Sequence, residues 1–155
     1  MTPAINCLKK SNISYQVHHY DHDPNSKAYG EEAAEKLKVS FDRIFKTLVI
    51  LIDNKILSVA MVPVSRQLDL KAVATALGSK KTAMADKKAV ERSTGYILGG
   101  VSPIGQKKQL KTILDRSALN HNTVFVSAGR RGLQIELSPK DLASQTHAIY
   151  GDISK

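Results

Sequence analysis

One lysine lies in a setting where its charge needs a partner. Lys46 follows Phe45 inside segment 45–52, which is otherwise almost entirely apolar. Burying an unpaired ammonium group costs several kcal/mol, so the head of Lys46 should reach a cleft or the surface. In a cleft it could bind a phosphate or a carbonyl oxygen. The alternative is a lysine that extends along an edge strand into solvent.

A glycine-rich segment is the second candidate for chemistry. Residues 95–105 contain four glycines and one proline. Glycines let the backbone approach a ligand closely and point its amides at an anion. The same composition also fits a plain turn between two strands.

Other reactive residues have weaker patterns. In cluster 18–23, His18 and His22 would lie on one face of an extended chain, but roughly 13 Å apart, so we expect no metal site. Cys7 has no histidine near it in sequence, and we expect it to be buried as a small hydrophobe rather than to act as a nucleophile. The chain contains no GxSxG, P-loop, GxGxxG or HExxH motif.

Sequence periodicity and capping residues predict the helices and strands that must position these residues. Thr2, Asp69, Asp86 and Ser138 are typical helix caps. They and the apolar spacing predict helices over 3–10, 31–38, 70–77 and 87–93, and a final helix after Ser138. Alternation and β-branched runs predict strands over 14–20, 45–52, 56–64, 96–98, 110–114, 123–128 and 133–137.

The order of these elements predicts the fold class. Segments 45–52 and 56–64 should form a hairpin near the sheet centre, while helices interleave with the other strands. We expect an α+β (mixed α/β) fold: a single domain over 1–155, with a central mixed, partly barrel-like β-sheet and surrounding helices.

Composition favours an anionic partner. Lysine and arginine number 23 against 14 acidic residues, a formal net charge of +9. Such an excess suits a nucleic acid backbone, although a merely solvated surface could also carry it. A single cysteine allows no intramolecular disulfide, no segment is long and apolar enough for a membrane span, and the start has no signal-peptide pattern. We therefore expect a cytoplasmic protein without membrane partners.

Several short segments, in their order and spacing, resemble the YbaK family of trans-editing domains, relatives of the editing insertion of bacterial prolyl-tRNA synthetases. They are Thr2-Pro3-Ala4, Tyr20-Asp21-His22-Asp23, Glu32-Ala33-Ala34, Phe45-Lys46-Thr47-Leu48, Ser93-Thr94-Gly95-Tyr96, Gly99-Gly100-Val101-Ser102-Pro103 and Val126-Ser127-Ala128-Gly129. The resemblance covers essentially the whole chain. It is nearest to the free-standing Cys-tRNA(Pro) deacylases.

The resemblance implies a set of site residues. Lys46 would hold the acceptor end of the tRNA by a phosphate or sugar, and the backbone of a GxxxP loop would surround the aminoacyl group and help stabilise an oxyanion. The implied catalytic residues are Lys46, Gly99, Gly100 and Pro103, and the implied substrate-binding residues are Tyr20, Tyr29, Thr47, Ser102 and Ser127. Relatives often carry Phe at position 29, so the hydroxyl of Tyr29 could change the polarity of the pocket.

The resemblance also implies a mechanism and partners. The substrate's own thiol would attack its ester carbonyl, so the protein would need neither nucleophile nor metal nor cofactor, only positioning. The partners would be aminoacyl-tRNA, through the acceptor end of tRNA(Pro), and prolyl-tRNA synthetase. Two alternatives remain open: a deacylase for Ala-tRNA(Pro) or another small aminoacyl group, and a non-catalytic tRNA- or nucleotide-binding module of the same fold.

Overall fold

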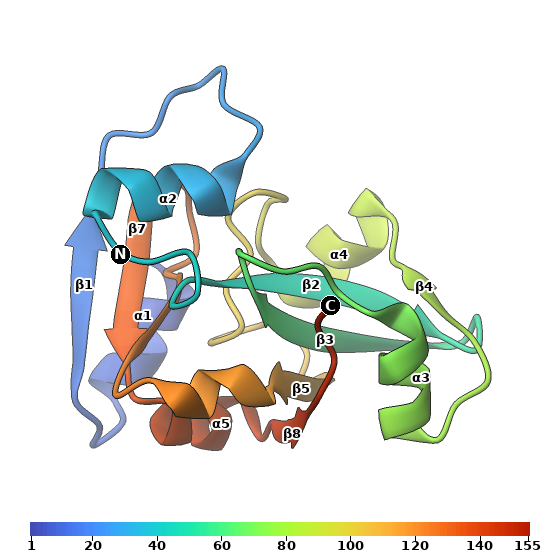
Figure 1. Cartoon of the computed structure of the whole chain (residues 1–155). Coiled ribbons are helices and arrows are strands. Elements are labelled where there is room, and N and C mark those ends of the chain that lie inside the picture. The colour runs from blue at the N-terminus through green and yellow to red at the C-terminus, as the bar shows by residue number, and fades with distance from the viewer.

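The two segments richest in β-branched residues form the hairpin at the centre of the fold. The computed structural model describes all residues, 1–155, and in it β2 (Phe45–Ile52) pairs antiparallel with β3 (Ile56–Pro63) along its whole length (Figure 1). Asp53 and Asn54 turn the chain with φ of 51° and 57°. This left-handed conformation is one that Asp and Asn tolerate better than most residues. The predicted hairpin is confirmed.

The larger sheet is built around this hairpin. Its order is β4-β2-β3-β5-β8, with β4 at Thr82–Met84, β5 at Lys111–Asp115 and β8 at Ile149–Gly151. The β2·β3 and β2·β4 pairs are antiparallel, while β3·β5 and β5·β8 are parallel. The sheet is therefore mixed, as predicted.

A second sheet lies beside the first. Its order is β1-β7-β6, all antiparallel, with β1 at Tyr15–His19, β6 at Val124–Ser127 and β7 at Leu133–Leu137. An isolated parallel bridge between Ile44 and Phe125 connects it to the start of β2. The strands thus divide between two sheets, and neither closes into a barrel. With its helices, this arrangement confirms the α+β class.

The predicted caps begin four of the five α-helices. The side chains of Thr2, Asp69, Asp86 and Ser138 each accept a hydrogen bond from the backbone N–H three residues later. The helices they begin are α1 (Pro3–Lys9), α3 (Leu70–Leu77), α4 (Lys87–Thr94) and α5 (Pro139–Thr146). The fifth, α2 (Tyr29–Leu37), begins two residues before its predicted start and has no side-chain cap.

One predicted strand is wrong. Residues 96–98 belong to a loop, because Gly95 leaves α4 with φ of 81° and the hydroxyl of buried Tyr96 donates to the Ile104 carbonyl at 2.6 Å. The chain therefore curls back on itself instead of extending. The short edge strands β4 and β8 and the 3-10 helix over Arg116–Asn120 were not predicted.

Three apolar clusters hold the elements together. The largest includes Phe45 and Val49 of β2, residues of β6 and β7, and residues of α1 and α5. A second joins α3 to the other face of the hairpin. In the third, Ala33 and Ala34 of α2 pack near Ile44. No helix is long and apolar enough to cross a membrane.

Candidate functional site

A cavity of about 390 Å³ gathers most of the predicted site residues. It lies among the first half of β2, the start of α2, the loop after α4 and the turn between β6 and β7. Six of the nine predicted residues line it: Tyr20, Tyr29, Lys46, Thr47, Gly99 and Ser127. A second hollow of about 440 Å³, near Asp115 and Asp152, is lined by none of the nine. The first cavity is therefore the candidate site.

The cavity meets β2 where one edge of the strand is open. β3 covers the other edge over all eight residues, but β4 pairs only with Ile50–Ile52. The segment from Phe45 to Leu48 is left without a strand neighbour on the cavity side, and all four of its residues line the cavity. Lys46 therefore lies on an open strand edge and also lines the cavity, and its role in binding stays a prediction.

The three-stranded sheet supplies polar groups to the cavity. Ser127 of β6 and Gln134 of β7 are register partners, so their side chains share a face of the sheet, and both line the cavity. Gln134 Oε1 and Thr47 Oγ1 are buried and have no hydrogen-bond partner within the chain. Unpaired buried polar atoms are costly, so these two are candidates for contact with a bound molecule.

Tyr29 forms one wall and needs glycine beside it. A Cβ on Gly99, whose φ is 97°, would come within 3.2 Å of the Tyr29 ring. The Arg131 side chain packs here as well: its Cδ would lie 3.6 Å from that Cβ, and its guanidinium carbon lies 4.4 Å from the ring centroid. Both the positive φ and the close approach require glycine at position 99.

Arg131 also anchors the strap, which we define as residues 21–28 between β1 and α2. Its Nη2 donates to the carbonyls of Asp23 and Ser26, each at 2.9 Å, and lies 3.9 Å from buried Glu32. Glu32 in turn accepts a hydrogen bond from the Asp23 N–H at 2.7 Å. The charge of Arg131 is thus used within the protein, to fix the strap and the start of α2 over the cavity.

The remaining cations of the cavity are free. Lys27, Lys46 and Arg130 line it and take part in no ion pair or side-chain hydrogen bond, while Glu31 is the only carboxylate in the lining. An unpaired positive field of this kind attracts an anionic ligand.

Burial also affects a hydroxyl in the lining. Desolvation raises the pKa of Tyr20, and the nearby Glu32 carboxylate adds to the rise against the opposing effects of the Gly132 backbone and Arg131. The phenol of Tyr20 therefore stays protonated at neutral pH and is available as a hydrogen-bond donor.

Three predicted residues do not line the cavity but build the loop behind it. Gly100 is buried, and a Cβ there would lie 2.7 Å from the Arg130 Cα. Ser102 is fully buried and its Oγ accepts from the Ile104 N–H at 3.2 Å. Pro103 is buried next to it. Their placement suits support of the glycine loop rather than direct contact with a ligand.

The cavity residues that were not predicted from the sequence include Lys27, Arg130, Arg131 and Gln134. The two arginines lie in the turn that joins β6 to β7. Two consecutive arginines between glycines were the available signal, since such a turn projects charge from the end of a sheet. Nothing in the sequence indicated that strap 21–28 folds over the same cavity.

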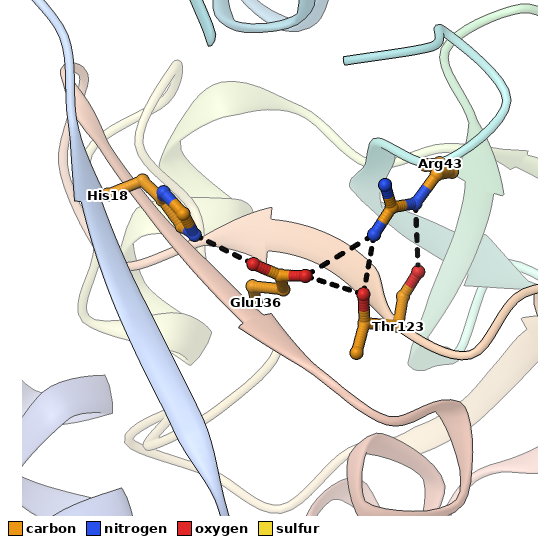
Figure 2. A network of polar contacts seen from close by, with 4 residues as sticks. All are labelled: His18, Arg43, Thr123 and Glu136. Atoms are coloured by element: carbon orange, nitrogen blue, oxygen red, sulfur yellow. Dashed lines mark hydrogen bonds and ion pairs between the residues drawn. The ribbon is translucent and has the colours of Figure 1, made fainter.

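Beside the cavity, a polar network joins the start of β2 to the smaller sheet. Figure 2 shows Glu136 between His18, Arg43 and Thr123, with distances of 2.8 Å to His18 Nε2, 3.3 Å to Arg43 Nη2 and 2.6 Å to Thr123 Oγ1. Burial alone would raise the pKa of Glu136, but these hydrogen bonds and the charges of His18 and Arg43 lower it. Two residues along β7 from Glu136 is Gln134, so the network braces the sheet next to the cavity.

Two residues considered for metal binding and nucleophilic chemistry lie elsewhere. His18 pairs with Glu136, and no group of three or more His, Cys, Asp or Glu side chains is placed to hold a metal ion. Cys7 is partly buried on α1, with its Sγ 3.8 Å from Gln145 Oε1, and does not line the cavity.

Comparison with models of protein families identifies the family of the domain that contains the cavity. Residues 23–144 match the model of the aminoacyl-tRNA editing domain. The chain belongs to this family. The match includes every cavity residue named above except Tyr20, and it confirms the resemblance to YbaK-type editing domains.

Individual relatives agree with this membership. The chain is 39% identical over 153 residues to an Enterococcus faecalis protein described as "Putative Cys-tRNA(Pro)/Cys-tRNA(Cys) deacylase EbsC", covering 99% of this chain and 93% of that protein. It is 32% identical over 131 residues to the uncharacterized protein YwhH of Bacillus subtilis, covering 84% of this chain and 83% of the relative.

Solved structures share the fold. The hypothetical protein APE2540 superposes with a TM-score of 0.87 at 25% identity, covering 99% of this chain and all of that one. A structure described as "a putative trans-editing enzyme for prolyl tRNA synthetase" superposes with a TM-score of 0.86 at 24% identity, covering 99% and 95% of the two chains. At 24% identity, the similarity to this second structure supports a shared fold only.

Proposed function

We propose that this protein is a trans-editing deacylase that removes cysteine wrongly attached to tRNA(Pro). The observation that carries the proposal is the cavity of an aminoacyl-tRNA editing domain in which three free cations surround buried hydroxyl and amide groups. The cations suit the acceptor end of a tRNA, and the few buried hydroxyl and amide groups in a largely apolar lining suit a small aminoacyl group. The name of the Enterococcus faecalis relative supports cysteine as that group.

The reaction that suits this cavity uses the thiol of the substrate. The sulfur attacks the ester carbonyl and forms a C–S bond, the C–O bond to the terminal ribose breaks, and the ribose oxygen takes up the thiol proton. The products are a cysteine thiolactone and free tRNA. The cavity lining supports this route because it contains neither cysteine nor histidine, and its Thr47 and Ser127 hydroxyls form no hydrogen bond with a side chain that could act as a base.

The protein's contribution would be positioning and electrostatics. Lys46 would hold the acceptor end by a phosphate or sugar oxygen, and Gly99, with no side chain, would let backbone approach the aminoacyl group. Tyr20, Thr47 and Ser127 would orient that group by hydrogen bonds. Holding thiol and carbonyl in attack geometry can lower a barrier by about 7–11 kcal/mol in favourable cases. Gly100, Ser102 and Pro103 would act through the loop they support.

The test is a comparison of amino acids on one tRNA. Purified protein should release cysteine from Cys-tRNA(Pro) much faster than buffer does, and alanine or serine from the same tRNA far more slowly. Release of all three at similar rates would replace the thiol route with hydrolysis and make the enzyme a general editor of small residues. Saturable binding without release would make it a non-catalytic tRNA-binding module.

The extent of the domain and its partner are part of the same proposal. We propose that the editing domain comprises 1–155, since α1 and β1 contribute to the main apolar cluster outside the matched segment. We further propose prolyl-tRNA synthetase as the partner that supplies tRNA identity, as the description of the structural relative suggests. Adding that synthetase should lower the KM for Cys-tRNA(Pro) without changing the KM for a cysteine ester.

A further inference from the structure

Two consecutive aliphatic side chains are exposed in the loop that leads into the cavity. Ile97 is 74% exposed and Leu98 is 51% exposed. Leu98 lines the cavity and is followed directly by Gly99. We call this pair the apolar ledge.

The ledge is held in place by the loop that carries it. The Gly100 N–H donates to the Ile97 carbonyl at 2.9 Å, and the Leu98 N–H donates to Glu91 Oε2 at 3.1 Å. Tyr96, directly before the ledge, is buried and anchored through its hydroxyl. The exposure of Ile97 and Leu98 is therefore a property of a fixed loop, and a fixed apolar surface is ready for contact with a ligand.

The surroundings of the ledge are cationic. Arg130 and Lys27 line the same cavity and are exposed, without acidic partners. Arg131 is not available, because it binds the strap and covers Tyr29. Tyr29 is 37% exposed, and the Arg131 guanidinium over its ring leaves less of the ring free for stacking. Ile97 and Leu98 are more exposed than Tyr29 and so offer the larger free apolar surface beside the mouth.

We propose that the ledge binds the terminal nucleobase of an RNA 3′ end, while Lys27 and Arg130 bind the adjacent phosphates. This inference rests on the proposed function and names the part of the tRNA that the cavity mouth contacts. A flat apolar base and nearby anionic phosphates match an aliphatic surface flanked by unpaired cations. Contact with aliphatic side chains carries no hydrogen-bond readout, so it suits a 3′ end common to all tRNAs.

The experiment compares a nucleic acid substrate with one that has no base. The double variant Ile97→Ser, Leu98→Ser is assayed with Cys-tRNA(Pro) and with cysteine ethyl ester, and Ile56→Ser is the control because Ile56 is 61% exposed at the far hairpin turn. Loss of one base contact should raise the KM for the tRNA roughly 5- to 100-fold. The effect on the ethyl ester should be at least about fivefold smaller, and Ile56→Ser should change neither substrate. Equal effects on both substrates, or none on the tRNA, would overturn the proposal.

Two further measurements distinguish a base contact at the ledge from a purely ionic effect and from self-association. Replacing Lys27 and Arg130 by Gln should reduce the salt dependence of tRNA binding, whereas the ledge variant should leave that slope unchanged. If the wild type released no cysteine, the proposed function would fail, but titration of a CCA trinucleotide would still test the ledge. Weaker binding of the trinucleotide by the double variant supports the ledge, and equal binding overturns it. Loss of self-association with unchanged trinucleotide binding would identify the ledge as an interface between copies, and so would also overturn it.

Discussion

Arg131 places its guanidinium carbon 4.4 Å from the centre of the Tyr29 ring, and the same guanidinium donates to two carbonyls of strap 21–28. One side chain from the β6–β7 turn thereby positions both a cavity wall and the segment that leads to it. This connects two parts of the chain that are about one hundred residues apart and makes Arg131 a positioning residue.

Replacing Arg131 with Met should therefore loosen the strap. The variant keeps much of the side-chain volume but loses two hydrogen bonds and the stack, so the free energy of unfolding should fall by about 1–3 kcal/mol. Limited proteolysis should detect faster cleavage within 21–28, and the KM for Cys-tRNA(Pro) should rise. Arg66→Met, at an exposed arginine without a side-chain hydrogen bond, is the matched control and should behave like wild type. A strap no more sensitive to protease in Arg131→Met would count against this role.

Gly100→Ala should distort the site through a steric clash with the backbone of Arg130. Its Cβ would lie 2.7 Å from the Arg130 Cα, so the glycine loop and the arginine turn must separate. We expect a loss of about 1–3 kcal/mol in stability and a clear loss of deacylation. Gly78→Ala is the control: nothing lies within 4 Å of its Cβ, and its φ of 66° costs about 1–2 kcal/mol on its own. That variant should lose stability but keep its activity, which separates the two effects.

The lowered pKa of Glu136 predicts how the free energy of unfolding changes at acidic pH. Its pKa is lowered in the folded state, so its carboxylate contributes stability that is present above the unfolded pKa and lost as pH falls through the folded pKa. Denaturant titrations at a series of pH values below about 5 should show a steeper loss in wild type than in Glu136→Gln. Parallel curves would mean that the network in Figure 2 has no such role.

The raised pKa of Tyr96 predicts how the stability of the fold changes at alkaline pH. Burial raises its pKa to about 12, so its protonated form contributes stability that is fully present below pH 10 and lost as the pH rises toward 12. Tyr96→Phe loses the hydrogen bond to Ile104 and should be about 1 kcal/mol less stable at pH 7. Across that alkaline window it should lose less stability than wild type does. A wild type whose alkaline transition matched that of the variant would show that Tyr96 does not cause the transition.

Local signals were enough to predict most of the fold. Helix caps at Thr2, Asp69, Asp86 and Ser138 act over three residues, and the β2–β3 hairpin is a local pairing, so both could be read from neighbours in sequence. Strands of three residues such as β4 and β8 carry too little periodicity to be recognised. They exist because existing sheet edges pair with them.

The site was predictable only in part, for a related reason. Lys46 is an ammonium group in an apolar strand, and the loop is a cluster of glycines. Both patterns are unusual over a few residues, so both could be recognised from the sequence. Arg131 and Gln134 look ordinary in sequence. Their roles depend on the strap and on the register of β6 with β7, which are tertiary features.

We propose that cysteine is released from its tRNA in the cavity at Lys46. The rate of that release in a Lys46 variant tests this location. Lys46 has no acidic partner, so Lys46→Ala should fold normally, and Lys111→Ala, at an exposed lysine outside the cavity, is the matched control. The measurement is the single-turnover release of cysteine from Cys-tRNA(Pro). We expect wild-type release in Lys111→Ala and a loss of about 100-fold or more in a folded Lys46→Ala. Wild-type release by Lys46→Ala would contradict the proposed site.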